Sequence, residues 1–185
     1  MKKTFVASIA AAALALASFS AIAQMKDPKV GGATMYPTKT IVENAVNSPI
    51  HTTLVAAVKA AGLVDTLNGP GPFTVFAPTN AAFDKLPAGT VANLLKPENK
   101  STLVKILTYH VLPGKITAKD IEAGIKAGGG KYEMTTVEGG KLTATMKHGK
   151  IMLTDEKGGM ATITTANVYQ SNGIIDVINA VLMPS

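Results

Sequence analysis

The spacing of hydrophobic residues is helical in the first half of the chain and alternating in the second. Apolar residues recur every three or four positions in SPIHTTLVAAVKAAG (residues 48–62) and again in PENKSTLVKILTYH (residues 97–110). This period places them on one side of an amphipathic helix. A further helix is predicted in residues 117–127, where Thr117 and Asp120 have the spacing of a capping box.

After residue 130 the hydrophobic period falls to two. The segments KYEMTTV, KLTATMK, KIMLTD and ATITTANV alternate in polarity and are joined by glycine-containing turns, which predicts an antiparallel meander. FTVFAP (residues 73–78) and the apolar run near the C-terminus predict two more strands that are covered on both faces. Helices followed by strands indicate an α+β domain around a mostly antiparallel sheet or sandwich.

Residues 1–23 have the features of a secretory signal peptide. Two lysines precede an apolar run rich in Ala and Leu, and Ala21-Ile22-Ala23 predicts cleavage before Gln24. The alternative, a membrane anchor, is disfavoured because the run lacks stop-transfer charges and is short for a span of ~20 residues. Residues 24–39, with Gly-Gly and two prolines, are expected to form an extended lead-in to one domain over residues 40–185. We therefore expect an exported protein, periplasmic or extracellular, without a transmembrane anchor.

The composition argues against several classes of site. The chain has no Cys, which removes disulfides, thiol nucleophiles and thiolate metal ligands. All 18 cationic side chains are Lys, and the absence of Arg argues against a reader of nucleic acid. No phosphate loop, nucleophile elbow or metal-spaced His pair occurs, so we expect no enzyme activity, catalytic residue, metal or cofactor. Lys141, Lys147, Lys150 and Lys157 gather in the predicted meander, a modest candidate for contact with a polyanion.

The chain contains three histidines, and they lie in different settings. His51 is off the apolar stripe of its helix and is expected at the surface, and His148 occupies a glycine turn. His110 lies on the stripe in the last turn of its helix, where a hydrogen-bonded core residue is commoner than a ligand or a base. Tyr109 is rotated by about 100° around the helix, which places it towards the edge of the stripe.

Three segments together resemble the fasciclin domain family. TVFAPTNAAFDKLP (residues 74–87) and NGIIDVINAVLMP (residues 172–184) are similar to its two signature boxes, and YHVLPG (residues 109–114) lies where the family has a Tyr-His motif. The resemblance covers the chain from about residue 40 to its end. It implies a wedge-shaped β-sandwich of about seven strands with a layer of short helices formed by the N-terminal half.

The resemblance also implies a function. Fasciclin domains are secreted adhesion or interaction modules, so the expected partner is a protein or glycan of a cell envelope, an extracellular matrix or a host surface. In animal members the Tyr-His region has been implicated in receptor binding, which here indicates Tyr109 and His110. An alternative is a carrier of a small apolar ligand such as a carotenoid or a lipid, because some members bind carotenoids.

The second signature box departs from the family pattern at two positions. Asp176 and Asn179 stand where the family commonly has His and Asp. Asp176 alternates onto the same face as several apolar residues of the last strand, so its carboxylate requires a hydrogen-bond partner or an exposed strand edge. A solvated edge position and a role in partner binding both remain open for it.

Overall fold

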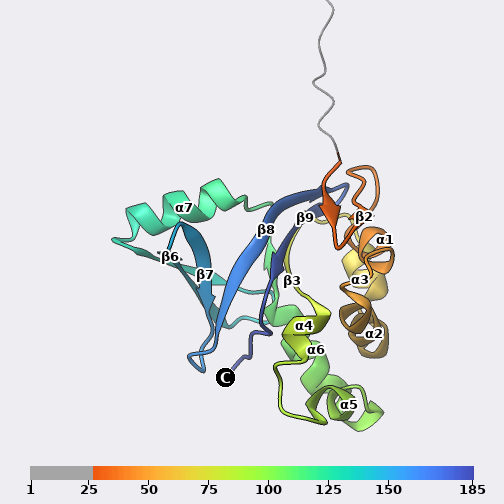
Figure 1. Ribbon diagram of the computed structural model, residues 1–185. Helices are drawn as coiled ribbons and strands as arrows, with labels where there is room; N and C mark the ends of the chain where they lie inside the picture. The colour runs from red at the N-terminus through yellow and green to blue at the C-terminus, as the bar shows by residue number, and fades with distance from the viewer. Residues whose placement is uncertain (1–26) are drawn as a thin grey trace, which may run out of the picture.

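A seven-stranded sheet that folds along one of its strands forms the centre of the molecule (Figure 1). The computed structural model describes residues 27–185, and the expected signal peptide with its cleavage site lies outside them. The strand order is β4-β3-β9-β8-β7-β6-β5, and neighbours are antiparallel except for the parallel pair β3–β9. The strands are β3 (Phe73–Pro78), β4 (Val111–Pro113), β5 (Lys131–Thr135), β6 (Lys141–Lys147), β7 (Lys150–Thr154), β8 (Met160–Gln170) and β9 (Gly173–Ile178).

Strand β8 belongs to both halves of the sheet. Its start pairs with β7 over Met160–Thr162, and the rest pairs with β9 from Ile163 to Gln170, with register shifts between residues 163 and 168. Such bulges bend a strand and increase its twist, and here they turn the meander β5–β8 away from the half formed by β4, β3 and β9. The expected α+β fold with about seven strands and a helical layer is confirmed.

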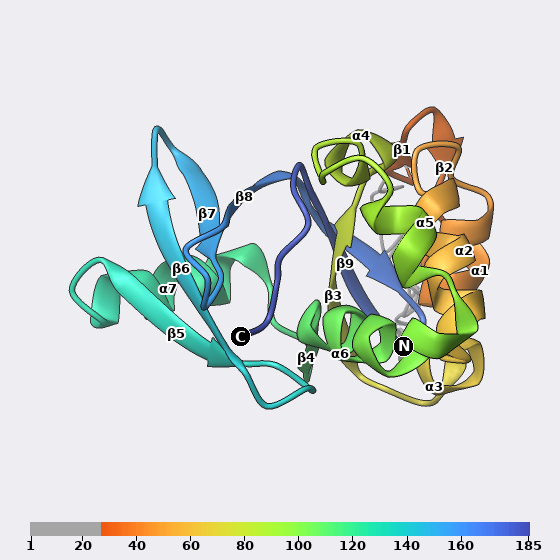
Figure 2. The same cartoon turned by 90° about the horizontal axis from the view of Figure 1, so that it is seen from below.

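Helices cover the two halves of the sheet separately (Figures 1 and 2). Most of them lie beside the β3–β9 half, and α7 lies across the meander. They are α1 (Ile41–Val46), α2 (Thr52–Ala61), α3 (Val64–Asn68), α4 (Asn80–Phe83), α5 (Thr90–Leu94), the 3-10 turn η1 (Pro97–Asn99), α6 (Lys100–Tyr109) and α7 (Ala118–Ala127). This division produces two hydrophobic cores, one on each side of β3 and β9. Both strands are therefore buried on both faces, as their apolar sequences predict.

Local sequence signals explain where several helices begin. Thr117 and Asp120 form the predicted capping box at α7, and Thr40 and Glu43 form another at α1. The lead-in is more ordered than an extended segment, because β1 (Lys29–Val30) and β2 (Ala33–Thr34) form a small hairpin. Its Val30 is buried in the first core. Among residues 27–185, no helix has the length and hydropathy that crossing a membrane requires.

Candidate functional site

His110 is a buried structural residue at the C-terminal end of α6. The side chain is 3% exposed, and its Nδ1 lies 2.8 Å from the carbonyl oxygen of Ile106. The backbone N–H of Leu182 donates to Nε2 at 3.0 Å. Because an N–H can only donate, Nε2 is the unprotonated nitrogen and Nδ1 carries the proton. Burial lowers the pKa of His110 to about 4, so the ring is neutral near pH 7 and ties α6 to the segment after β9. The interpretation of His110 as a hydrogen-bonded core residue agrees with this position.

Tyr109 is also buried, and the expectation that it lies at an exposed helix edge is wrong. Its side chain is 0% exposed. The hydroxyl donates to the carbonyl of Lys141 at 2.5 Å and accepts from the backbone N–H of Glu156 at 3.2 Å. Burial raises the pKa of Tyr109 to about 12, which keeps the phenol a donor. The ring is buried because the meander closes over this side of α6, so Tyr109 joins the first residue of β6 to the turn between β7 and β8.

The same region holds the C-terminal tail, defined here as residues 179–185. The carboxylate of Asp155 accepts from the backbone N–H groups of Met183 at 2.8 Å and Gly159 at 2.6 Å. Glu156 accepts from the N–H of Ser185 at 3.1 Å. Together with the bond from Leu182 to His110, these contacts fix the tail by three of its own backbone donors. The Tyr-His segment thus organises a junction of helix, turn and tail.

Asp176 lies in the middle of the sheet, so the interpretation as a solvated edge-strand acid is wrong. Strand β9 runs between β3 and β8, and Asp176 is 0% exposed. The N–H of Asn167 donates to Oδ1 at 2.7 Å, whereas Oδ2 has no partner among the described residues. Burial raises the pKa of Asp176 to about 6.

The contact from Asp176 shapes the bulge in β8. Asn167 has a φ of 58°, a left-handed conformation that Asn tolerates better than most residues. Its side-chain oxygen accepts from the N–H of Ala118, the first residue of α7, at 2.9 Å. Asp176 therefore helps to hold the bulge that positions α7 on the meander.

The three residues that the sequence indicated do not form one site. Strand β3 separates His110 from Asp176, because Phe76 lies between them. The N–H of Phe76 donates to the carbonyl of His110, and Phe76 is paired with Asp176 in the register of β3 and β9. His51, expected at the surface, is 3% exposed and hydrogen-bonded to Ser48. Across residues 27–185, no group of three or more His, Asp or Glu side chains is placed to hold a metal ion.

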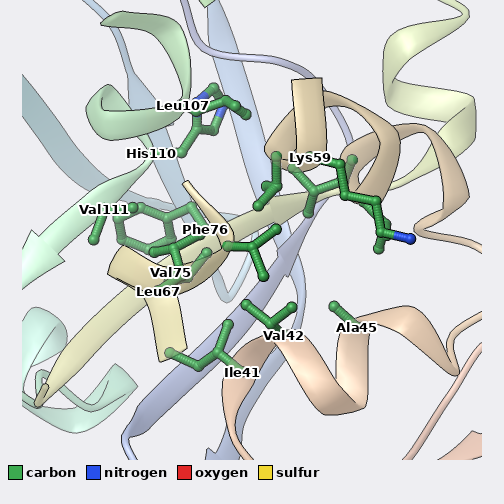
Figure 3. Close-up of a pocket in the computed structure, with 14 residues that line it drawn as sticks. Ile41, Val42, Ala45, Lys59, Leu67, Val75, Phe76, Leu107, His110 and Val111 are labelled. Atoms are coloured by element: carbon green, nitrogen blue, oxygen red, sulfur yellow. The ribbon is translucent and has the colours of Figure 1, made fainter. Parts of the chain in front are cut away.

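An apolar cavity lies between the helical layer and β3 (Figure 3). Side chains from α1, α2, α3, β3 and the end of α6 surround it, and the amino group of Lys59 points away from them. Its volume is about 40 Å³, whereas pockets for drug-sized ligands measure ~300–1,000 Å³. The cavity is therefore far too small for a carotenoid. A second hollow of about 470 Å³ is an open groove, lined mainly by the segment between α4 and α5 and by residues of α5.

The meander presents a face that the helices leave open. Its alternating polarity is predicted by the sequence, whereas its accessibility is visible only in the structure. Helix α7 packs on the inner face, whose apolar residues belong to the second core. The other face, here called the outer face, is seen in Figure 2 from the side opposite α7. By strand register it carries Lys131, Glu133, Thr135, Lys141, Thr143, Thr145, Lys147, Lys150, Met152, Thr154, Met160, Thr162 and Thr164.

Comparison with known proteins identifies relatives over most of the chain. The Fasciclin domain model matches residues 49–184. Protein sll1483 of Synechocystis sp. is 53% identical over 145 residues, which are 78% of this chain and 73% of that protein. Cell surface glycolipoprotein MPB83 of Mycobacterium bovis is 39% identical over 145 residues, which are 76% of this chain and 58% of that protein.

A solved structure shares the fold. The FAS1 domain pair from the insect cell adhesion molecule Fasciclin I superposes with a TM-score of 0.69 at 20% sequence identity. The match covers 78% of this chain and 51% of that chain, so this chain spans about half the length of the domain pair. At this identity the likeness concerns the fold alone.

Proposed function

Because the chain belongs to the fasciclin domain family, we propose that it is an exported, non-enzymatic adhesion module. Its partner is a component of a cell envelope, an extracellular matrix or a host surface. The names of two similar proteins support this assignment: MPB83 is a cell surface glycolipoprotein, and Fasciclin I is a cell adhesion molecule. Neither name identifies the partner of this chain.

The observation that carries the proposal is the contrast between the buried motif residues and the open outer face. Tyr109, His110 and Asp176 are each 3% exposed or less, so they support the fold from inside. The outer face is a broad, mostly polar surface on the strands β5–β8, with Met152 and Met160 among its lysines and threonines. A sheet held by regular hydrogen bonds keeps its side chains in fixed relative positions. We assign partner contact to this face in place of the Tyr-His pair.

Adhesion is measured with labelled residues 24–185 on intact cells, by flow cytometry, with unlabelled protein as competitor. Thr145→Glu combined with Thr162→Glu places two charges on the outer face, in one cross-strand row with Met152 between them. The matched control is Ser101→Glu with Thr102→Glu, at two exposed positions in the first turn of α6. We expect saturable binding that the outer-face variant loses and the control retains.

Each other result contradicts a different part of the proposal. Absence of saturable binding to cells and to purified envelope or matrix fractions contradicts the adhesion function. Binding that both variants retain leaves the function standing and removes the outer face as the contact surface. Melting temperatures of all variants are recorded first, because a binding loss counts only for a folded protein.

A further inference from the structure

One end of the outer face carries three lysines that no acidic side chain of the described chain neutralises. Lys147 and Lys150 lie directly opposite each other at the tip of the β6–β7 hairpin. Lys131 pairs with Thr145, two residues before Lys147 on the same face. The two ion pairs within residues 27–185 involve other lysines: Lys141 bonds Glu133 at 3.1 Å and Lys105 contacts Glu138 at 3.8 Å.

The geometry of this cluster favours an anion from outside the chain. Like charges directly opposite on neighbouring strands destabilise a sheet, and the Lys147–Lys150 pair is of this kind. Residues 139–154 contain no Asp or Glu, so the hairpin supplies no counter-charge of its own. An anionic group held between the lysines would remove the repulsion.

We propose that this end of the outer face binds an acidic polysaccharide. The inference rests on the proposed function and names the chemistry of its partner. Carboxylate or sulfate groups contact Lys131, Lys147 and Lys150, and sugar hydroxyls contact Thr145 and Thr162. Neighbouring strands lie ~4.8 Å apart and residues on one face of a strand ~6.7 Å apart, so the backbone positions that carry the lysines are separated by distances comparable to the length of a sugar unit.

The side chains of the outer face fit a polysaccharide better than other polyanions. A threonine hydroxyl both donates and accepts, which matches the hydroxyls of a sugar. No aromatic residue lies on this face, whereas single-stranded nucleic acids stack on aromatic rings. Membrane-surface binding uses Trp, Phe or Leu that enter the bilayer, and the outer face has none of these.

Binding through exposed lysines is weak at each site and sensitive to salt. Charges at the surface are screened over ~8 Å at physiological ionic strength. A polysaccharide with many repeats compensates by engaging many copies of the protein at once, so that avidity replaces single-site affinity. Each exposed lysine contact changes the dissociation constant by up to about fivefold.

The test uses residues 24–185 and four probes: alginate, neutral dextran, polyphosphate, and vesicles of phosphatidylglycerol with phosphatidylcholine. Lys147→Gln with Lys150→Gln removes the opposed pair. The matched control, Lys119→Gln with Lys126→Gln, removes the same charge from exposed positions of α7. We expect the first variant to bind alginate at least tenfold more weakly and the control to bind like the wild type.

Thr145→Val distinguishes a polysaccharide from a general polyanion, because it removes a hydroxyl and keeps the shape of the side chain. It should weaken binding to alginate and leave binding to polyphosphate unchanged. Equal losses in the two lysine variants would show that only net charge matters and would overturn the proposal. Binding to vesicles that exceeds binding to alginate would also overturn it, in favour of a membrane surface.

The two proposals fail separately. If the wild-type protein adheres to cells and the double variant Lys147→Gln with Lys150→Gln adheres equally well, the proposed polysaccharide site is wrong and the proposed adhesion function is retained. If alginate binding depends on the lysines but no surface is bound, the lysine site stands and the adhesion function is wrong.

Discussion

Asp176 and His110 are both buried, and burial shifts their pKa values in opposite directions. The pKa of Asp176 rises from 3.8 to about 6, so its favourable contribution is present below pH 3.8 and is lost as the pH rises through 6. The pKa of His110 falls from 6.5 to about 4, so its contribution is present above pH 6.5 and is lost as the pH falls through 4. Between these limits the two residues change the free energy of unfolding with opposite slopes.

The two contributions are similar in size. One pKa unit corresponds to about 1.4 kcal/mol, so the rise of the Asp176 pKa from 3.8 to about 6 and the fall of the His110 pKa from 6.5 to about 4 each contribute about 3 kcal/mol over the full titration. The wild-type protein should therefore show little net pH dependence from this pair. The substitution Asp176→Asn removes the contribution of Asp176 to the pH dependence of the free energy of unfolding and leaves that of His110. The side-chain oxygen at position 176 can still accept from the N–H of Asn167, and the variant resembles the protonated acid.

The Asp176→Asn variant should match the wild type only below pH 3.8 and exceed its stability by up to about 3 kcal/mol near pH 7. Urea denaturation followed by circular dichroism from pH 3.5 to 7.5 measures this difference. His51, whose pKa burial also lowers, adds to the slope of His110. A variant that is no more stable at pH 7, or that has the same pH dependence as the wild type, would refute an ionised, incompletely paired Asp176 in the core.

Three further outcomes are expected. Tyr109→Phe removes the hydroxyl that joins Lys141 to Glu156 and should lower the free energy of unfolding by about 1–3 kcal/mol, measured by urea denaturation. Gly140→Ala should also destabilise the protein, because the added Cβ would lie 2.8 Å from the Tyr109 ring; an unchanged melting temperature would contradict this packing. Export should remove residues 1–23, and an intact mass of the exported protein that includes them would refute the signal peptide.

Patterns in the sequence predicted most of the fold because these patterns depend on interactions between residues that are close in the sequence. The capping box of Thr117 and Asp120 and the alternation of the meander depend on neighbours in the sequence, and the structure contains both. The stripe of α6 likewise placed His110 inside. The alternation and the stripe follow from the period of a strand or a helix, and the capping box follows from hydrogen bonds within one helical turn.

The environments of Tyr109 and Asp176 depend on distant segments. Tyr109 is off the stripe of α6. Its hydroxyl is hydrogen-bonded to Lys141 and Glu156, which are 32 and 47 positions away in the sequence. Alternation placed Asp176 on an apolar face, but whether β9 is an edge or a central strand depends on the order β3-β9-β8. Helical and strand periods contain no information about distant contacts or about strand order. The exposure of Tyr109 and Asp176 could therefore not be predicted from the sequence.

The position of Tyr109 changes how a loss of binding in its variants is interpreted. Its hydroxyl holds the base of the β6–β7 hairpin, since Lys141 begins β6 and Glu156 follows β7 by two residues. The tip of the same hairpin carries Lys147 and Lys150. A substitution that frees the base can therefore disturb the lysines without Tyr109 touching any partner. Tyr109→Phe and Lys147→Gln should be combined: if Tyr109 acts only through the hairpin, the double variant binds alginate little more weakly than Lys147→Gln alone, whereas additive losses indicate independent effects.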